Sequence, residues 1–325
     1  MDEIFVKANK IFKQNFLAQT SFERAIFFSW YCSKRDCKFC YMSSKEVSKD
    51  ARRTVESLLA EAILCKKMGW KIGFVSGGHD AYTTIEFEKI LKLMSLVSEE
   101  KLWINIGPLK EEELRKYTPY IDGVVASIET INPKVHEFVC PSKPVEPFVK
   151  MFSYADQLGL KKAMTIILGI GESMEDYSLL REFILKNKIC KIHFYTLNPQ
   201  EGTYFEHSKR PNPEYQALWI ARTRIDFPKI DIQAGIWLDC VDRVPLLLEA
   251  GANSISKFPA IRHFGGAEAQ QIEEGARKAG REFVGTLIKM PTQDFDMSRI
   301  PNELRDDVGK KLQQYLKQMR RSIHT

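Results

Sequence analysis

Three cysteines lie within nine residues near the start of the chain, at Cys32, Cys37 and Cys40, among aromatic and basic side chains. Three thiolates at this spacing can each bind one iron of a cubane iron–sulfur cluster and leave the fourth iron without a protein ligand. An iron with an open coordination position can bind a second molecule and act on it. The triplet therefore predicts a reactive metal centre.

Other uses of the cysteines are weaker alternatives. A closed zinc site needs a fourth ligand, commonly from a second cysteine pair or from paired histidines, and no such pair follows in the sequence. Disulfides are disfavoured because seven cysteines is an odd number and we expect no secretory signal. A non-catalytic, zinc-binding scaffold therefore stays open as an alternative to a cluster enzyme.

The composition is that of a globular protein, with 44% hydrophobic and 28% charged residues in a chain of 325. No apolar run is long enough to cross a bilayer, so we expect a cytoplasmic protein with no membrane partner. The 48 Lys and Arg exceed the 42 Asp and Glu, and the basic excess clusters only in the last sixteen residues. This balance weakly favours anionic partners, and we expect no nucleic acid among them.

Short apolar runs alternate with helix-like segments from residue 25 onward, and each run is rich in β-branched or aromatic residues, as in a parallel sheet buried on both faces. The expected strands are residues 25–30, 71–75, 102–106, 121–128, 163–168, 191–195, 230–234 and 253–256. Eight strands separated by helices predict an α/β fold of the closed (β/α)8, TIM-barrel-like type, with an open doubly wound sheet as the alternative. Either fold binds ligands at the carboxyl ends of its strands, where the cysteines follow the first strand.

Segments at both ends flank the predicted barrel, which spans residues 21–290. Apolar residues recur at helical spacing near the N-terminus, which predicts a capping helix within residues 1–20. Residues 291–325 begin as a polar linker and continue as an amphipathic helix over 303–321. We expect this helix to pack on the barrel with its basic end in solvent, and docking onto an acidic partner is the alternative.

The cysteine loop resembles that of the radical S-adenosylmethionine (SAM) superfamily. Members carry a CxxxCxxC loop after the first barrel strand, with an aromatic residue before the last cysteine, where Phe39 stands here. The first gap holds four residues instead of three, which leaves the path of the loop open, while the second half of the motif is intact. The resemblance implies one 4Fe-4S cluster bound by Cys32, Cys37 and Cys40, with SAM as a second cofactor.

Further segments resemble the family at the ends of later strands. The Gly-Gly pair after the second strand resembles the element that receives the amino group of SAM, although His79 stands where an acid is usual. Segments after the fourth, fifth and sixth strands resemble those that contact the ribose, methionine and adenine parts. The resemblance implies SAM contacts from Phe39, Ser76, Gly77, Gly78, Ser127, Glu129, Ile167, Gly169 and Leu197.

Within the superfamily the chain is similar to the group of biotin synthase, hydrogenase maturases and methylornithine synthase. The second, sulfur-donating cluster of biotin synthase is not expected, because positions that match two of its ligands hold Ala163 and, approximately, Asp231. The longer cysteine gap is most similar to the maturase of mono-iron (Hmd) hydrogenase, which is linked to the biosynthesis of the guanylylpyridinol cofactor. Another enzyme of the same branch, such as a carbon-skeleton mutase, is the alternative.

The resemblance implies an anaerobic enzyme that receives one electron from an external donor such as ferredoxin or flavodoxin. Reductive cleavage of SAM would give a 5′-deoxyadenosyl radical, which removes a hydrogen atom from a small organic substrate. Candidate substrate contacts are polar and aromatic residues at the remaining strand ends, for each of which packing or solvation is the alternative role. They are Tyr195, Asp231, Trp237, Lys257 and Arg262.

Overall fold

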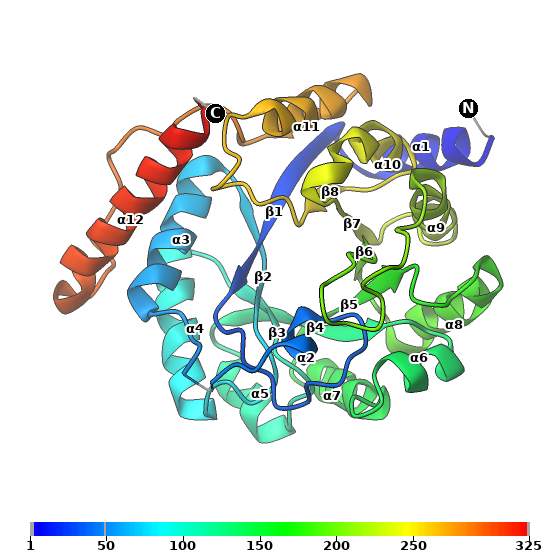
Figure 1. The fold of residues 1–325 in the computed structure, drawn as a ribbon, viewed down its shortest axis with the longest axis horizontal. Coiled ribbons are helices and arrows are strands. Elements are labelled where there is room, and N and C mark those ends of the chain that lie inside the picture. Colours follow the sequence, from blue (N-terminus) through cyan, green and yellow to red (C-terminus); the bar gives the residue numbers. More distant parts are fainter. Residues whose placement is uncertain (1–2, 49, 324–325) are drawn as a thin grey trace.

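A computed structural model describes residues 3–48 and 50–323, and its strands close into a barrel (Figure 1). Within these residues eight parallel strands follow one another in sequence order, and β1 closes the ring by pairing with both β2 and β8. The strands are β1 (Gln19–Phe27), β2 (Lys71–Ser76), β3 (Leu102–Asn105), β4 (Ile121–Glu129), β5 (Lys161–Leu168), β6 (Lys191–Thr196), β7 (Asp231–Gly235) and β8 (Ser254–Ser256). The predicted (β/α)8 fold is confirmed, since in an open sheet β1 and β2 would not pair with each other.

The first strand begins earlier than the sequence predicted. Its first residues, Gln19 to Ser21, pair with β9 (Glu282–Val284), a strand that the sequence analysis missed. Polar side chains at Thr20, Ser21 and Glu23 interrupt the apolar run, although all three are buried. A continuous apolar run therefore marks only the second half of β1.

Helices surround the barrel and cover the outer face of the strands (Figure 1). Several begin where a side chain accepts a hydrogen bond from a free backbone N–H, as Thr54, Thr83 and Asn212 do. The helices between strands are α3 (Val55–Met68), α4 (Thr84–Ser98), α5 (Glu111–Tyr117), α7 (Glu146–Gln157), α8 (Tyr177–Asn187), α9 (Pro213–Asp226) and α10 (Val244–Glu249), and α11 (Ala267–Lys278) follows β8. The short helices α2 (Tyr41–Ser44), α6 (Pro133–Val139), η1 (Met174–Asp176) and η2 (Leu238–Arg243) lie in loops that follow β1, β4, β5 and β7.

The terminal helices pack on the outside of this ring. The N-terminal α1 (Glu3–Asn15) contacts α9 and α10, and the C-terminal α12 (Asn302–Ile323) lies along α3, as Figure 1 shows. The hydroxyl of Tyr315 in α12 accepts a hydrogen bond from Arg53 (2.7 Å), next to the first turn of α3. In the described part of the chain, no helix is both long enough and apolar enough to span a membrane.

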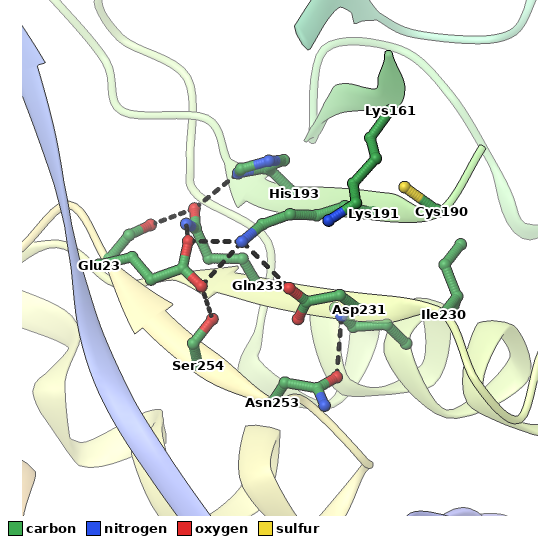
Figure 2. A network of polar contacts seen from close by, with 12 residues as sticks. Glu23, Lys161, Cys190, Lys191, His193, Ile230, Asp231, Gln233, Asn253 and Ser254 are labelled. Carbon is green, nitrogen blue, oxygen red and sulfur yellow. Dashed lines mark hydrogen bonds and ion pairs between the residues drawn. The ribbon is translucent and has the colours of Figure 1, made fainter. Parts of the chain in front are cut away.

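A buried polar network fills the interior of the barrel (Figure 2). The carboxylate of Glu23 in β1 accepts hydrogen bonds from Lys191 in β6 (2.8 Å to each oxygen) and from Gln233 in β7 (2.5 Å). Ser254 in β8 donates to the same carboxylate (2.8 Å). Gly73 in β2 leaves room for this cluster, because a Cβ there would lie 3.1 Å from a Glu23 oxygen. Side chains from three strands therefore converge on one carboxylate.

Charge pairing keeps Glu23 ionised. Burial alone would raise the pKa of its carboxyl, but the ammonium of Lys191 and the hydrogen bonds to it lower the pKa to about 2. The neighbouring His193 is uncharged, because burial and the charge of Lys191 lower its pKa to about 3. The Gln233 oxygen accepts a hydrogen bond from the Nδ1–H of His193 (2.8 Å), and this contact orients the Gln233 amide.

Replacing Glu23 by Gln should destabilise the barrel. Lys191 would keep only the half-exposed Asp231 (3.1 Å) as an anionic partner, and breaking a buried pair on one side costs about 3–5 kcal/mol. Urea unfolding followed by circular dichroism measures the loss. The matched control is Asp307→Asn, which breaks the exposed pair with Lys310 and should leave the unfolding midpoint almost unchanged. Equal midpoints for the two variants would contradict a structural role for Glu23.

Candidate active site

The carboxyl ends of the strands surround a cavity of about 750 Å³, and the cysteine loop after β1 forms part of its wall. This is the end of a (β/α)8 barrel at which ligands bind. Most residues that the sequence singled out line the cavity. They are Cys32, Cys37, Phe39, Cys40, Ser76, Gly77, Gly78, Ser127, Glu129, Ile167, Tyr195, Leu197, Trp237, Lys257 and Arg262.

Gly169 and Asp231 lie elsewhere, so these two predictions need correction. Gly169 takes a φ of 95° in the turn after β5, where its N–H donates to Glu172 (2.6 Å) outside the cavity. Asp231 is the first residue of β7, at the opposite end of the barrel, and pairs with Lys191. The sequence analysis counted Asp231 among the substrate contacts at strand ends, but it lies at the amino end of β7, whereas ligands bind at the carboxyl ends.

Contacts on two sides hold the four-residue gap between the first two cysteines. The N–H of Ser33 donates to the backbone oxygen of His79 (3.1 Å), in the loop after β2. The carboxylate of Asp36 accepts from the backbone N–H (3.0 Å) and the hydroxyl of Ser142, after α6. The longer gap is thus an anchored loop, which settles the path that the sequence left open.

Two glycines at the end of β2 let the cysteine loop approach. A Cβ at Gly78 would overlap the backbone oxygen of Tyr31 and lie 2.5 Å from the Cβ of Cys32. A Cβ at Gly77 would overlap the ring of Phe28. Only glycine fits where main chain passes this close to a neighbouring loop. The pair therefore fixes the position of Cys32 relative to β2.

The arrangement of the thiols distinguishes between the two metal hypotheses. Among residues 3–48 and 50–323, no three Cys, His, Asp or Glu side chains are close enough to hold a single metal ion. A zinc scaffold requires such a set, so the geometry gives that alternative no support. A cubane takes each thiolate on a different iron, and its ligands need not converge on one atom. The donor set therefore fits a 4Fe-4S cluster.

The protein environment treats the thiols differently. A hydrogen bond from the buried Cys140 lowers the pKa of Cys37, whereas burial raises the pKa of Cys40 to about 12. Cys140 lies against Cys37 in one apolar cluster. A thiol with a raised pKa stays protonated at neutral pH, so a metal that binds there would displace a proton.

A buried ion pair lies close to Cys37 in the cavity. Glu129, at the end of β4 with a φ of 63°, accepts a hydrogen bond from the ammonium of Lys143 (2.7 Å) and one from Thr165 (3.2 Å). Burial alone would lower the pKa of Lys143, but the Glu129 carboxylate raises it above its ordinary value. Both side chains are therefore charged, and together they offer an anion and a cation to one ligand.

An apolar group lies beside the cysteines. Phe39 and Ile167 pack with Cys37 against a cluster that includes Leu197 and Phe205. These residues come from the cysteine loop, β5 and the loop after β6, so the fold brings together segments far apart in sequence. Three of the side chains that the resemblance assigned to SAM thus form one apolar surface at the cavity wall.

The tentative substrate residues lie on the other side of the cavity, at β6 to β8. Tyr195 is the fifth residue of β6, Trp237 follows β7, and Lys257 follows β8. Arg262 lies further along the loop after β8, is exposed, and lines the mouth. They come from other strands than the ion pair, but Tyr195 and Lys257 lie within electrostatic range of Glu129.

Sequence reasoning missed two buried residues that line this cavity. Asn105 ends β3 and accepts a hydrogen bond from Ser127 (2.7 Å), and its place at a strand end was a signal that could have found it. Lys143 sits in an irregular segment after α6, where no local pattern marks it. His79 was noticed but given no role, and burial lowers its pKa to about 4, so it is a neutral wall residue.

Comparisons with known proteins indicate the family of this chain. The model of the radical SAM superfamily matches residues 27–184. The chain is 36% identical to an uncharacterized protein of Methanocaldococcus jannaschii, over 99% of this chain and 97% of the relative. It is 24% identical to biotin synthase of Thermotoga neapolitana, over 77% and 87%. The crystal structure of methylornithine synthase shares the fold, with a TM-score of 0.69, 23% identity, and coverage of 78% of this chain and 76% of that one.

Replacing Gly78 by Ala should prevent the cysteine loop from reaching its position, because the added methyl group would overlap the backbone of Tyr31. We expect severalfold less iron and sulfide per chain after anaerobic reconstitution, measured by metal analysis and by visible absorbance. The control is Gly309→Ala in α12, where no atom lies within 4 Å of the added methyl group and alanine favours the helix. Full iron content in the Gly78 variant would show that the close approach is unnecessary.

Proposed function

This chain belongs to the radical SAM superfamily, within its biotin synthase-like branch, and we propose that it cleaves SAM reductively to begin radical chemistry on a small organic substrate. The observation that carries the proposal is that Cys32, Cys37 and Cys40 all face the cavity at the carboxyl ends of the strands. The cavity is large enough for SAM and a small second molecule side by side.

Cys32, Cys37 and Cys40 would hold the 4Fe-4S cluster. When bound, this cluster supplies the electron, taken from an external donor such as ferredoxin or flavodoxin, that cleaves SAM to methionine and a hydrogen-abstracting 5′-deoxyadenosyl radical. The anchored gap and the Gly77–Gly78 approach keep the three thiols in one place. Preorganised ligands of this kind need little rearrangement when the cluster binds.

The cavity wall beside the cysteine loop would bind SAM. The main chain at Ser76 to Gly78 lines the cavity there, so its polar groups can contact the methionine part. Glu129 and Lys143 together match a zwitterion, since one attracts an ammonium group and the other a carboxylate. Ser127 is oriented by Asn105, and Phe39, Ile167 and Leu197 offer the apolar surface that an adenine ring needs.

The remaining side of the cavity would hold the substrate close to SAM. Its walls include the rings of Phe74, Tyr195 and Trp237, which leave less room for water where a radical would react. Tyr195 and Trp237 are fixed by hydrogen bonds to Gln233 (3.0 Å) and to the backbone oxygen of Thr196 (3.0 Å). Fixed walls of this kind hold reacting atoms near one another.

The narrower proposal is that the substrate is a precursor of guanylylpyridinol, the cofactor of mono-iron (Hmd) hydrogenase. It rests on the four-residue gap between Cys32 and Cys37. A second candidate, rearrangement of a carbon skeleton, rests on the branch to which the chain belongs, because that branch includes methylornithine synthase. Both use the same cluster site and differ only in the molecule that occupies the side of β6 to β8.

The enzyme assay tests the general proposal. Anaerobically reconstituted protein with dithionite should convert SAM to 5′-deoxyadenosine and methionine, which chromatography with mass detection measures. Cys37→Ala should abolish the conversion because one iron ligand is lost. Cys190→Ala is the matched control and should keep the activity, since Cys190 is exposed at the start of β6. No conversion by the unaltered protein, or equal rates for both variants, would refute the proposal.

Isotope transfer tests the narrower one. Deuterated candidate pyridinol precursors are added to the same assay, and mass spectrometry measures deuterium in 5′-deoxyadenosine. We expect transfer from a true substrate, because the radical takes its hydrogen from the molecule held beside SAM. An incubation without precursor gives the background. Unlabelled 5′-deoxyadenosine with every precursor would reject the Hmd role and leave SAM cleavage in place.

A further inference from the structure

Lys257 occupies an unusual position on the substrate side of the cavity. It follows β8 with a φ of 70°, in the left-handed region, and its side chain turns inward to line the cavity. Its ammonium lies over four aromatic rings, with centroid distances of 4.4 Å (Tyr195), 5.6 Å (Phe27), 5.9 Å (Trp237) and 6.0 Å (Phe74). These rings attract a cation through their faces and offer no anion to it.

The other part-buried or buried cations that line this cavity each contact a carboxylate. Arg24 and Arg53 both bind the carboxylate of Glu61 (2.5 Å each), and Lys143 binds Glu129. Within the described residues, Lys257 has no ion pair and donates no hydrogen bond to a side chain or backbone oxygen. Lys34 and Arg262 also line the cavity, but both are exposed to solvent at the mouth.

A cation in such a place has lost much of its hydration without gaining a counter-ion. Burial accordingly lowers the pKa of Lys257 to about 8, with Glu129 and Cys40 as the nearest acidic groups that oppose the shift. The aromatic rings offset part of the lost hydration energy of the ammonium. A ligand carboxylate would offset more of it, because a charge-assisted hydrogen bond is strong where little water competes. The site is therefore complementary to an anion with an apolar body.

We propose that Lys257 binds the carboxylate of the substrate, which makes the substrate a small organic acid whose apolar part packs against the rings of Tyr195 and Trp237. This inference rests on the proposed function, since it places the acid beside SAM. Trp237 and Tyr195 direct their polar atoms to Thr196 and Gln233, so their apolar surfaces stay available to the ligand. Binding at Lys257 would hold the acid on the side of the cavity formed by β6 to β8.

Matched pairs of acids and amides test the proposal. Propionate, benzoate and phenylacetate, each with its neutral amide, are titrated into SAM-loaded, reconstituted protein by calorimetry without a reductant. At least one acid should bind about tenfold or more tightly than its amide. This ratio corresponds to the free energy that a hydrogen bond to a charged group typically contributes. Lys257→Met should remove the preference. Lys34→Met, which deletes an exposed lysine at the same cavity, should retain it.

A measurement on the unaltered protein guards against a variant that fails to fold. Lysines are acetylated briefly with acetic anhydride, and mass spectrometry measures the rate at each site. The preferred acid should slow the acetylation of Lys257 severalfold and that of Lys34 little, while the amide protects neither. The inference is overturned if no acid in the panel outcompetes its amide, if Lys257→Met keeps the preference, or if the acid leaves Lys257 unprotected.

The outcomes also separate this inference from the proposed function. Binding is measured without electron transfer, so an acid preference can be present in a protein that does not cleave SAM, and that result would refute the proposed function alone. A protein that cleaves SAM but treats acids and amides alike would refute the role of Lys257 alone.

Discussion

The buried ion pair between Glu23 and Lys191 is the interaction on which the floor of the cavity depends. Lys191 keeps the carboxylate ionised inside the barrel, and the carboxylate then accepts a hydrogen bond from Gln233 (2.5 Å). Gln233 in turn accepts one from the hydroxyl of Tyr195 (3.0 Å), whose ring lies under the ammonium of Lys257. The buried charge of Glu23 thus fixes the ring of Tyr195. Each group in this series of hydrogen bonds is buried, so water is not available to it as an alternative partner.

Charge is distributed unequally across the cavity above this floor. On the side of β4 and β5, Glu129 and Lys143 neutralise each other, which suits a zwitterion that carries both signs. On the side of β6 to β8, Lys257 has aromatic neighbours and no carboxylate. A zwitterion is stabilised on the side of β4 and β5 because it can pair with both Glu129 and Lys143. An anion is stabilised on the side of β6 to β8 because it supplies the counter-ion that Lys257 lacks. The same cavity can therefore hold two different ligands without exchanging their places.

The fold was predictable because a parallel barrel leaves a strong pattern: each strand is a short apolar run, and the cysteines follow the first. The pattern failed where burial and polarity coincide, since Thr20, Ser21 and Glu23 are buried yet polar and hid the start of β1. Asp231 was wrongly chosen as a substrate contact, because the expected strand, residues 230–234, already placed it at the amino end, away from the end at which ligands bind. The partnership of Lys143 with Glu129 was beyond reach, because it joins an irregular loop to a strand end only in three dimensions.

The length of the cysteine gap and the identity of the substrate are set by different parts of the molecule. Ser33 and Asp36 in the gap are held by the loops after β2 and α6. The rings around Lys257 come from β1, β2, β6 and the segment after β7. Either region can change without disturbing the other, so a shared cysteine spacing does not require a shared substrate. Relatives that keep Lys257 with its rings and no paired carboxylate should share a preference for acids, and this makes the strand ends a better guide to the substrate than the cysteine loop.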